Sequence, residues 1–211
     1  MKLVKKLIIS SLVITQIAIG HGAFAEAKAY DGVWFLGFNL KRPVTSSLKF
    51  RQAVSHALNR QSEEPIPGGV IPPGMNGSDP DLKPYKYNPK YAQQLMKNLP
   101  GAKNLVLLHT DGIKTIAIAK RIQKDLKQLG LKLQLEQVPY SEEEKWAEKL
   151  AAGKFDLFLM GYKAGGLTPS DLTDTDDLLD PLFKANGEAN FMGYVNTTVG
   201  DLYEQISGLE R

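Results

Sequence analysis

Apolar residues occur along the chain in short stretches separated by polar ones, and one nearly continuous stretch lies in its last third. Phe155 and residues 157–160 are apolar, and Asp156 alone interrupts them. Apolar side chains at successive positions are typical of a strand that is covered on both faces. The sequence therefore predicts a buried central strand within residues 153–162, which runs into a glycine-rich loop at residues 161–167.

Strands and helices alternate around this central strand. Residues 131–135 alternate apolar with polar side chains, which is typical of a strand with one solvated face, whereas Ile118, Ile122 and Leu126 recur at helical spacing. Further strands are expected at residues 33–40 and 104–109, and helices at residues 48–60, 89–96, 115–129 and 142–152. The order β-α-β-α-β predicts an α/β fold with a mostly parallel sheet flanked by helices.

Residues that favour helix ends mark several of these boundaries. The expected N-terminal caps are Ser46 or Ser47, Asn88 ahead of Pro89, and a capping box at Ser141-Glu142-Glu143-Glu144, and the expected stops are Gly130 and Gly153. Between the first two helices, residues 63–89 contain seven prolines and four glycines, which excludes a regular element. We expect this long loop to wrap the surface, with Tyr85 and Tyr87 as anchors.

The first 25 residues have the pattern of an export signal. Three lysines lie within the first six residues, an apolar stretch follows at residues 7–19, and Ala23-Phe24-Ala25 has the form of a cleavage site. We expect a signal peptide at residues 1–25, a single domain at residues 26–211, and a periplasmic or extracellular location. The alternative is an uncleaved anchor, but the apolar stretch is shorter than the roughly 20 residues of a spanning helix. The mature chain is therefore not expected to span a membrane.

Removal of this segment changes the charge of the chain. It takes away three of the 26 basic residues and no acidic one, which leaves 23 basic against 23 acidic residues. A neutral domain gives no electrostatic reason to bind nucleic acid or an anionic membrane. The chain also has no cysteine, which excludes a thiol nucleophile, a zinc–thiolate site and an iron–sulfur cluster.

The remaining candidates for catalysis and metal binding are few. His56 and His109 are the only histidines after residue 25, and no serine lies in a Gly-x-Ser-x-Gly sequence. Five acids crowd residues 171–180, at Asp171, Asp174, Asp176, Asp177 and Asp180, but they lack the glycine and glutamate of a calcium loop. We therefore expect that the protein is not an enzyme and that it has no metal site and no cofactor. We interpret His56 as a surface or packing residue.

Several segments resemble one protein family in their order and spacing. They are Leu36-Gly37-Phe38-Asn39, residues 50–60, residues 71–75, residues 122–130, Gly153-Lys154-Phe155-Asp156, Gly161-Tyr162, Asn190, Tyr194-Val195-Asn196 and Asp201-Leu202. This pattern resembles the family 5 extracellular solute-binding proteins, which are the oligopeptide- and dipeptide-binding proteins of ABC importers.

The resemblance implies a periplasmic-binding-protein-like fold of type II. Members of the family are much longer and close two lobes on a ligand, and this chain looks like their second lobe alone. The implied ligand is a small peptide or peptide-like solute. The implied partner is an ABC permease or a protein that supplies the missing lobe.

Ligands of open α/β sheets bind beyond the carboxyl ends of the strands, which places the expected site around the end of the central strand. The candidate ligand-binding residues are Tyr162, Lys163, Gly165, Gly166, His109 and Asp111. We expect Tyr162 to stack on or hydrogen-bond the solute, the two glycines to allow close approach, and Lys163 or His109 to select charge; an ordinary strand-to-helix turn is the alternative for residues 109–112. Family members that bind peptides carry an acid three or four positions beyond the Gly-aromatic pair. Here glycines stand at those positions, so the usual anchor for a peptide amino group is missing.

Two other interpretations remain. In the first interpretation, the domain has lost solute capture and serves as a protein-interaction module, which uses an exposed patch that includes Trp34 and Phe35. In the second interpretation, the chain is a truncated solute-binding protein without a function of its own.

Overall fold

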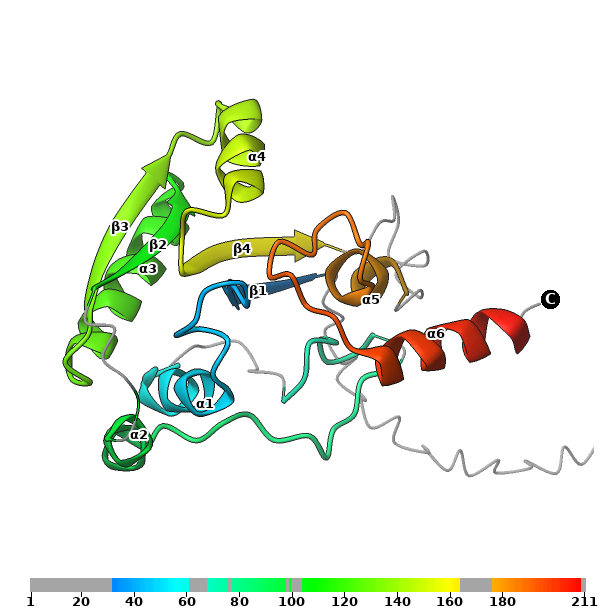
Figure 1. The fold of residues 1–211 in the computed structure, drawn as a ribbon, viewed down its shortest axis with the longest axis horizontal. Helices are drawn as coiled ribbons and strands as arrows, with labels where there is room; N and C mark the ends of the chain where they lie inside the picture. The colour runs from blue at the N-terminus through cyan, green and yellow to red at the C-terminus, as the bar shows by residue number, and fades with distance from the viewer. Residues whose placement is uncertain are drawn as a thin grey trace, which may run out of the picture.

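A four-stranded sheet organises the described part of the protein. The computed structural model describes residues 32–60, 68–75, 77–97, 99, 104–163 and 176–209. The strands are β1 (Gly32–Phe38), β2 (Asn104–Thr110), β3 (Lys132–Val138) and β4 (Leu157–Lys163), in the spatial order β1-β4-β2-β3. β2 is parallel to both β3 and β4, whereas β1 is antiparallel to β4. The predicted α/β fold with a mostly parallel sheet is confirmed, and β4 lies inside the sheet as expected (Figure 1).

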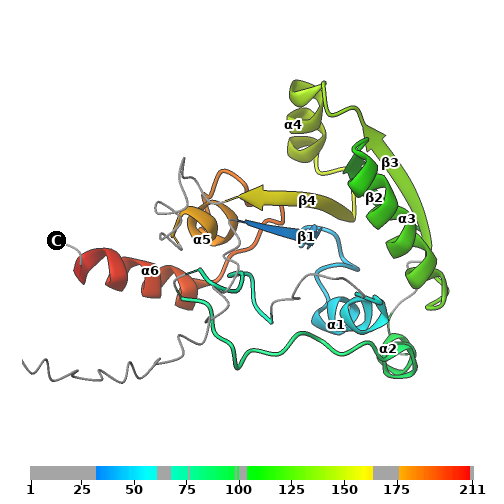
Figure 2. The same cartoon turned by 180° about the vertical axis from the view of Figure 1, so that it is seen from behind.

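The helices flank this sheet. They are α1 (Leu48–Ala57), α2 (Pro89–Met96), α3 (Ile113–Lys127), α4 (Glu143–Ala152), α5 (Asp176–Phe183) and α6 (Thr197–Leu209). The first four were predicted, but α1 ends three residues earlier than expected because Leu58 is already extended. α5 and α6 were not predicted as elements, and α6 projects away from the sheet toward the C-terminus (Figures 1 and 2).

Strand alternation divides the apolar core between the two faces of the sheet. On one face, Leu105 and Leu107 of β2 and Leu157 and Leu159 of β4 pack against α1, α2 and α3. On the other face, Phe158 of β4 belongs to a cluster with residues of α4, and a further cluster centres on α5. Figure 2 shows α3 lying against β2 and β3, with α1 and α2 below it in this view. β4 is thus covered on both faces, which explains its continuous apolar run.

Helix capping agrees with the sequence except at α4. The side chain of Ser47 accepts a hydrogen bond from the Phe50 amide, and Asn88 caps α2 in the same way. The expected capping box is wrong, because Glu142 is the N-cap residue of α4 and makes no side-chain cap hydrogen bond. Glu142 instead pairs with Lys145 at 2.7 Å. Gly153 ends α4 in the left-handed conformation, with φ of 61°, as predicted.

A buried polar cluster joins the start of β4 to β1 and β2. Asn39 is 2% exposed and donates its side-chain amide to the carbonyls of Gly153 and Phe155, at 3.1 and 3.0 Å. Asp156 accepts the Val106 amide on Oδ2 at 2.9 Å, while its own amide donates to the Val106 carbonyl at 3.0 Å. These bonds satisfy polar groups that would be costly to bury unpaired. Asn39 and Asp156, which belong to the resembling segments, therefore have a structural role.

The proline-rich segment wraps the surface in its described part, residues 68–75 and 77–88, and forms no helix or strand there. His56 contacts the C-terminal end of this segment. Its Nδ1 lies 2.8 Å from the Lys86 carbonyl oxygen, and its imidazole packs edge to face on the rings of Tyr85 and Tyr91, with centroid distances of 5.1 and 5.0 Å. Arg60 donates to the Tyr85 carbonyl, and partial burial lowers the pKa of its guanidinium below the usual value. His56 is thus a packing residue, as expected.

Candidate functional site

The carboxyl ends of β2 and β4 lie at the same edge of the sheet because the two strands are parallel. β1 starts at this edge, since it is antiparallel to β4, and its register pairs Trp34 with Gly161 and Val33 with Tyr162. The turn from β2 into α3 begins at the same edge. We call this region, defined by Trp34, Asp111, Lys114 and residues 161–163, the carboxyl edge.

Trp34 and Lys114 form one half of the carboxyl edge. The Trp34 side chain is 48% exposed, and Lys114 Nζ lies 5.6 Å from the centroid of its ring, a cation–π distance. A Cβ atom on Gly161 would come within 2.9 Å of the indole. Gly161 is therefore glycine because the tryptophan ring occupies the space of a side chain. The sequence indicated Trp34 only as part of an interaction patch, and no sequence signal pointed to Lys114.

Tyr162 lies on the opposite face of the sheet from Trp34. Successive residues of a strand point to opposite faces, and Tyr162 packs beside Met160 at the margin of the cluster formed by Met75, Leu178 and Leu182. Its side chain is half-buried. The carboxyl edge thus presents one aromatic ring on each face of the sheet.

His109 is enclosed in the interior. It is 1% exposed, and Nδ1 lies 2.7 Å from the carbonyl oxygen of Thr110, so Nδ1 carries the proton that is donated. Nε2 is buried and has no hydrogen-bond partner among the described residues. The ring therefore offers no surface to a solute in this conformation, and its proposed role in selecting charge stays a prediction.

Asp111 ties the ends of two strands together. Its Oδ1 accepts the amide of Tyr140 at 2.7 Å, and its own amide donates to the Val138 carbonyl at 3.1 Å. This geometry is that of the strand-to-helix turn that the sequence left as an alternative. Beside it, Ile113 is 92% exposed and Tyr140 is 73% exposed, so the same edge carries more apolar surface than the sequence indicated.

Some predicted residues fall outside the described part of the chain. Lys163 ends β4, but its side chain is not described, and Gly165, Gly166, Asp171 and Asp174 lie outside the described residues. Asp180 forms an ion pair with Lys184. Within the described ranges, no group of three or more histidine or acidic side chains could hold a metal ion. The same ranges contain no helix long and apolar enough to cross a membrane.

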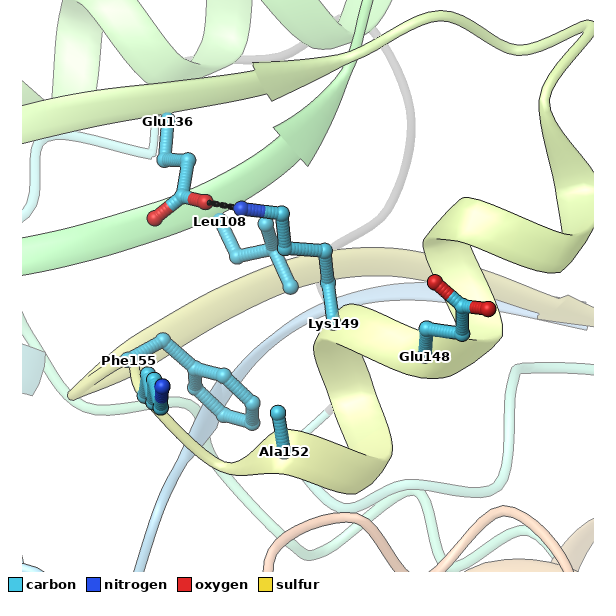
Figure 3. A pocket seen from close by; sticks show the side chains of 7 residues that line it. Leu108, Glu136, Glu148, Lys149, Ala152 and Phe155 are labelled. Atoms are coloured by element: carbon cyan, nitrogen blue, oxygen red, sulfur yellow. Dashed lines mark hydrogen bonds and ion pairs between the residues drawn. The ribbon is translucent and has the colours of Figure 1, made fainter.

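A pocket of about 240 Å³ lies away from the carboxyl edge, between α4 and the sheet (Figure 3). Phe155 and Leu108 supply apolar surface, and the Lys149 ammonium pairs with Glu136 at 2.5 Å. Figure 3 shows this ion pair above Leu108, with the Glu148 carboxylate turned away from Phe155. The sequence did not predict this pocket, because its lining joins residues of β2, β3 and α4. Its volume is below the roughly 300 Å³ at which ligand pockets usually begin.

The fold is similar to part of several solved solute-binding protein structures. The chain superposes on the periplasmic binding protein DppA from Helicobacter pylori in complex with the peptide STSA, with a TM-score of 0.69 and 20% identity over 82% of this chain and 35% of that one. It is similarly related to CtaP from Listeria monocytogenes, an ABC transporter substrate-binding protein, with a TM-score of 0.70 and 20% identity over 83% of this chain and 37% of that one.

A third structure is the oligopeptide-binding protein AppA from Bacillus subtilis in complex with a nonapeptide, with a TM-score of 0.68 and 21% identity over 84% of this chain and 39% of that one. The chain thus spans between 35% and 39% of the length of these three proteins. No curated protein sequence matched it.

The sequence itself matches a family description over most of its length. Residues 9–180 match the bacterial extracellular solute-binding proteins, family 5, middle region. The match begins within the expected export signal, whose residues lie outside those that the structure describes. Because this match covers well over half of the chain and the fold agrees with it, the protein belongs to the family 5 bacterial extracellular solute-binding proteins.

Proposed function

We propose that this chain is an exported, non-catalytic binding domain that takes a small peptide or peptide-like solute at the carboxyl edge and serves an ABC importer. Membership in the family supports solute binding, and the peptides bound to the related DppA and AppA structures support the class of solute. The signal pattern of residues 1–25 supports export.

The observation that carries this proposal is the group of side chains around the Gly161-Tyr162 pair. Trp34 offers an exposed aromatic face, Lys114 places an ammonium next to it, and Tyr162 brings a phenol to the same edge of the sheet. Aromatic rings provide apolar contact area at low entropic cost, and an ammonium attracts a carboxylate. These groups fit a solute that has both an apolar part and an anionic group.

The environment of both described histidines supports a non-catalytic role. The imidazole of His56 packs between two tyrosines, and that of His109 is buried against its own strand. A general base must reach the proton that it removes, and neither ring lies at an open site. The carboxyl edge thus offers contacts for binding rather than a nucleophile beside a base.

Native mass spectrometry of the chain, purified from the periplasm without denaturant, tests the proposal. We expect a mass that corresponds to cleavage after Ala25 and a reproducible small adduct. A solute identified from that adduct should raise the free energy of unfolding by about 2.7 kcal/mol at a hundredfold excess over its dissociation constant. A ligand-free chain that no peptide stabilises would contradict solute binding.

The second candidate function is that of a protein-interaction module. It is favoured by the exposed apolar residues at and beside the carboxyl edge: Trp34 is 48% exposed, and the neighbouring Ile113 and Tyr140 are 92% and 73% exposed. Phe35, by contrast, is half-buried and packs edge to face on Phe158 at 5.8 Å, so it does not contribute to such a patch. A stable complex with a protein bound at this edge, in a preparation that no solute stabilises, would favour this function over solute capture.

A further inference from the structure

The chain brings together two segments that contain no acidic residue. They are residues 48–60, which include α1, and residues 82–97, which include α2. The two segments pack against each other, because buried residues of both helices belong to the same core cluster. Their basic residues are Lys49, Arg51, Arg60, Lys83, Lys86, Lys90 and Lys97. The chain after residue 25 is therefore neutral in total, but the structure gathers basic residues in one part of it.

Residues 83–91 form an exposed part of this basic region. Their sequence, Lys-Pro-Tyr-Lys-Tyr-Asn-Pro-Lys-Tyr, interleaves three lysines with three tyrosines. The lysines are exposed, and so are the tyrosines, at 47%, 47% and 43% in chain order. Ammonium groups and phenol rings thus face the solvent side by side. We call this group the lysine–tyrosine surface; its members are Lys83, Tyr85, Lys86, Tyr87, Lys90 and Tyr91.

The backbone of the lysine–tyrosine surface is fixed to α1 while its side chains face the solvent. The Lys86 carbonyl oxygen lies 2.8 Å from His56 Nδ1, and the Asn88 amide donates to the His56 carbonyl at 2.8 Å. Arg60 donates to the Tyr85 carbonyl. Because this backbone is already ordered, a partner need not order it on binding, which lowers the entropic cost of association.

Acidic residues gather in another part of the molecule. Residues 142–152, which form α4 and its N-cap, contain four glutamates and two lysines. Figures 1 and 2 both show α4 at the top of the molecule and α2 at the bottom. An anionic surface attracts a basic side and repels an acidic one. This separation of charge favours an orientation in which the lysine–tyrosine surface faces such a surface.

The side chains of the lysine–tyrosine surface fit the headgroup layer of a phospholipid membrane. Tyrosine has an apolar body and a polar tip, and it is enriched where a membrane meets water. Lysine lays its methylene stem along apolar surface and keeps its ammonium group at the phosphates. Arginine, with its planar fork, is preferred where nucleic acid or a single phosphate is recognised, but the three cations here are lysines.

We propose that the exported chain docks reversibly on an anionic phospholipid membrane through the lysine–tyrosine surface. The phenol rings lie at the level of the headgroups, and the ammonium groups contact the lipid phosphates. The signal pattern of residues 1–25 supports a location beside a membrane and away from nucleic acid. A few lysines and interfacial rings hold a protein only weakly, so the docking depends on salt and on lipid charge.

Sedimentation with phospholipid vesicles tests the docking. The sample is the exported chain purified from the periplasm, with its mass checked for cleavage after Ala25, because the signal itself has the composition to bind lipid. Vesicles of equal parts phosphatidylglycerol and phosphatidylcholine should bind it at least about tenfold more tightly than phosphatidylcholine alone. The chain should dissociate at about 1 M salt, where the Debye length is only about 3 Å. Equal binding to the two kinds of vesicle, or binding to neither, would overturn the proposal.

Two double variants with the same change in charge locate the surface. Lys86→Gln with Lys90→Gln should weaken binding to the anionic vesicles by about fivefold for each lysine. Lys83 is left in place because its ammonium also donates to the Pro80 carbonyl. The control is Lys120→Gln with Lys154→Gln, two exposed lysines of α3 and of the loop before β4, and it should bind almost as well as the unmodified chain. Equal losses in both double variants would overturn docking at this surface.

A matched pair of tyrosine variants tests the contact of the rings with lipid. Tyr87→Ala should weaken binding to the anionic vesicles several-fold, because one interfacial ring is lost. Tyr140→Ala removes a more exposed tyrosine, beside the carboxyl edge, and should leave binding unchanged. Circular dichroism checks that each variant is folded. Unchanged binding of Tyr87→Ala would overturn the placement of the rings in the headgroup layer.

Two further probes separate a membrane from other anions. At the same salt concentration, the chain is offered a single-stranded oligonucleotide or inorganic phosphate alone. We expect neither to bind as tightly as the anionic vesicles. Tighter binding of the oligonucleotide would overturn membrane docking and assign the surface to nucleic acid, and binding of phosphate without binding of vesicles would reduce it to a site for a free anion.

This inference is independent of solute binding, since the lysine–tyrosine surface shares no residue with the carboxyl edge. A chain that binds peptide but no anionic vesicles would contradict membrane docking alone. A chain that binds vesicles but no peptide would contradict the proposed function alone.

Discussion

At the scale of single residues, Asp156 shows how a polar group inside an apolar run becomes necessary. It is 7% exposed, accepts the Val106 amide and pairs with Arg42 at 3.2 Å. The Arg42 side chain is 48% exposed, so solvent weakens that ion pair, and the backbone hydrogen bond is the more valuable contact.

Replacement of Asp156 should therefore reduce stability through its backbone partner. Asp156→Ala leaves the Val106 amide without an acceptor and should lower the free energy of unfolding by about 1–3 kcal/mol, as measured by urea denaturation. Asp156→Asn keeps an acceptor oxygen at the same place and should cost less. Equal losses in the two variants would show that the charge, rather than the hydrogen bond to Val106, is the important feature.

Tyr162 should contribute to binding through its ring and through its hydroxyl. Tyr162→Ala should weaken the proposed solute binding while the domain stays folded, because the ring is half-buried at the margin of its cluster and not at its centre. Isothermal titration with the solute measures the affinity, and circular dichroism checks the fold. Tyr162→Phe is the matched variant that keeps the ring: a loss as large as that of alanine would assign the interaction to the hydroxyl. Unchanged affinity in both variants would place the site elsewhere.

At the scale of elements, the helices show which sequence signals are strong. Ser47 and Asn88 cap α1 and α2 as predicted, because each is a short polar residue directly before the first helical turn. The signal at α4 was ambiguous, since Ser141 is followed by three glutamates that all favour a helix start. The Glu142 amide donates to the Pro139 carbonyl, which closes a turn through Ser141 and moves the helix start to Glu143.

The uncapped start of α4 predicts a stabilising substitution. Glu142→Asp shortens the side chain at the N-cap position, where aspartate can accept a first-turn amide, and should raise the free energy of unfolding by about 0.5–1 kcal/mol. Ser141→Ala serves as the comparison and should change stability by less than about 0.5 kcal/mol, because Ser141 is not the cap. Thermal unfolding of both variants measures the difference. A larger loss with Ser141→Ala would restore the capping box.

At the scale of the whole molecule, long-range contacts hold together parts that local patterns leave separate. The proline-rich segment runs from the α5 cluster, where Met75 is buried, to His56 on α1. Its described part forms no helix or strand, so its position depends on contacts such as these. His56 is therefore a residue whose importance follows from tertiary structure and not from its chemistry as an acid or base.

Loss of His56 should loosen the end of this segment. His56→Ala removes the hydrogen bond to Lys86 and two ring contacts, each of about 0.5–1.5 kcal/mol. We expect faster amide exchange at residues 85–88 and faster proteolysis there, with exchange in β2 and β4 unchanged. Lys49→Ala, at an exposed position of the same helix, is the control. Unchanged exchange at residues 85–88 would show that two other hydrogen bonds hold the segment: that of Arg60 to the Tyr85 carbonyl, and that of the Asn88 amide to the His56 carbonyl.

The sequence by itself determined the types of the first eight elements and most of their boundaries to within about two residues, since hydrophobic periodicity, caps and glycine stops act within a few residues. It also located the end of β4 as the candidate site, because ligands of parallel sheets bind at the carboxyl ends of strands. The sequence could not assign the side chains of that site to one or the other face of the sheet. Only the tertiary structure placed Trp34 beside Lys114, Tyr162 on the other face, and His109 out of reach of solvent.

The physical reason is the distance along the chain over which these contacts act. Asn39 and Asp156 join segments more than a hundred residues apart, and Trp34 meets Gly161 across antiparallel strands whose pairing no local pattern encodes. The strand order β1-β4-β2-β3 of the described residues has the same origin, because it is a property of the assembled sheet. Local periodicity specified the elements, and burial of their apolar faces against one another decided which side chains meet.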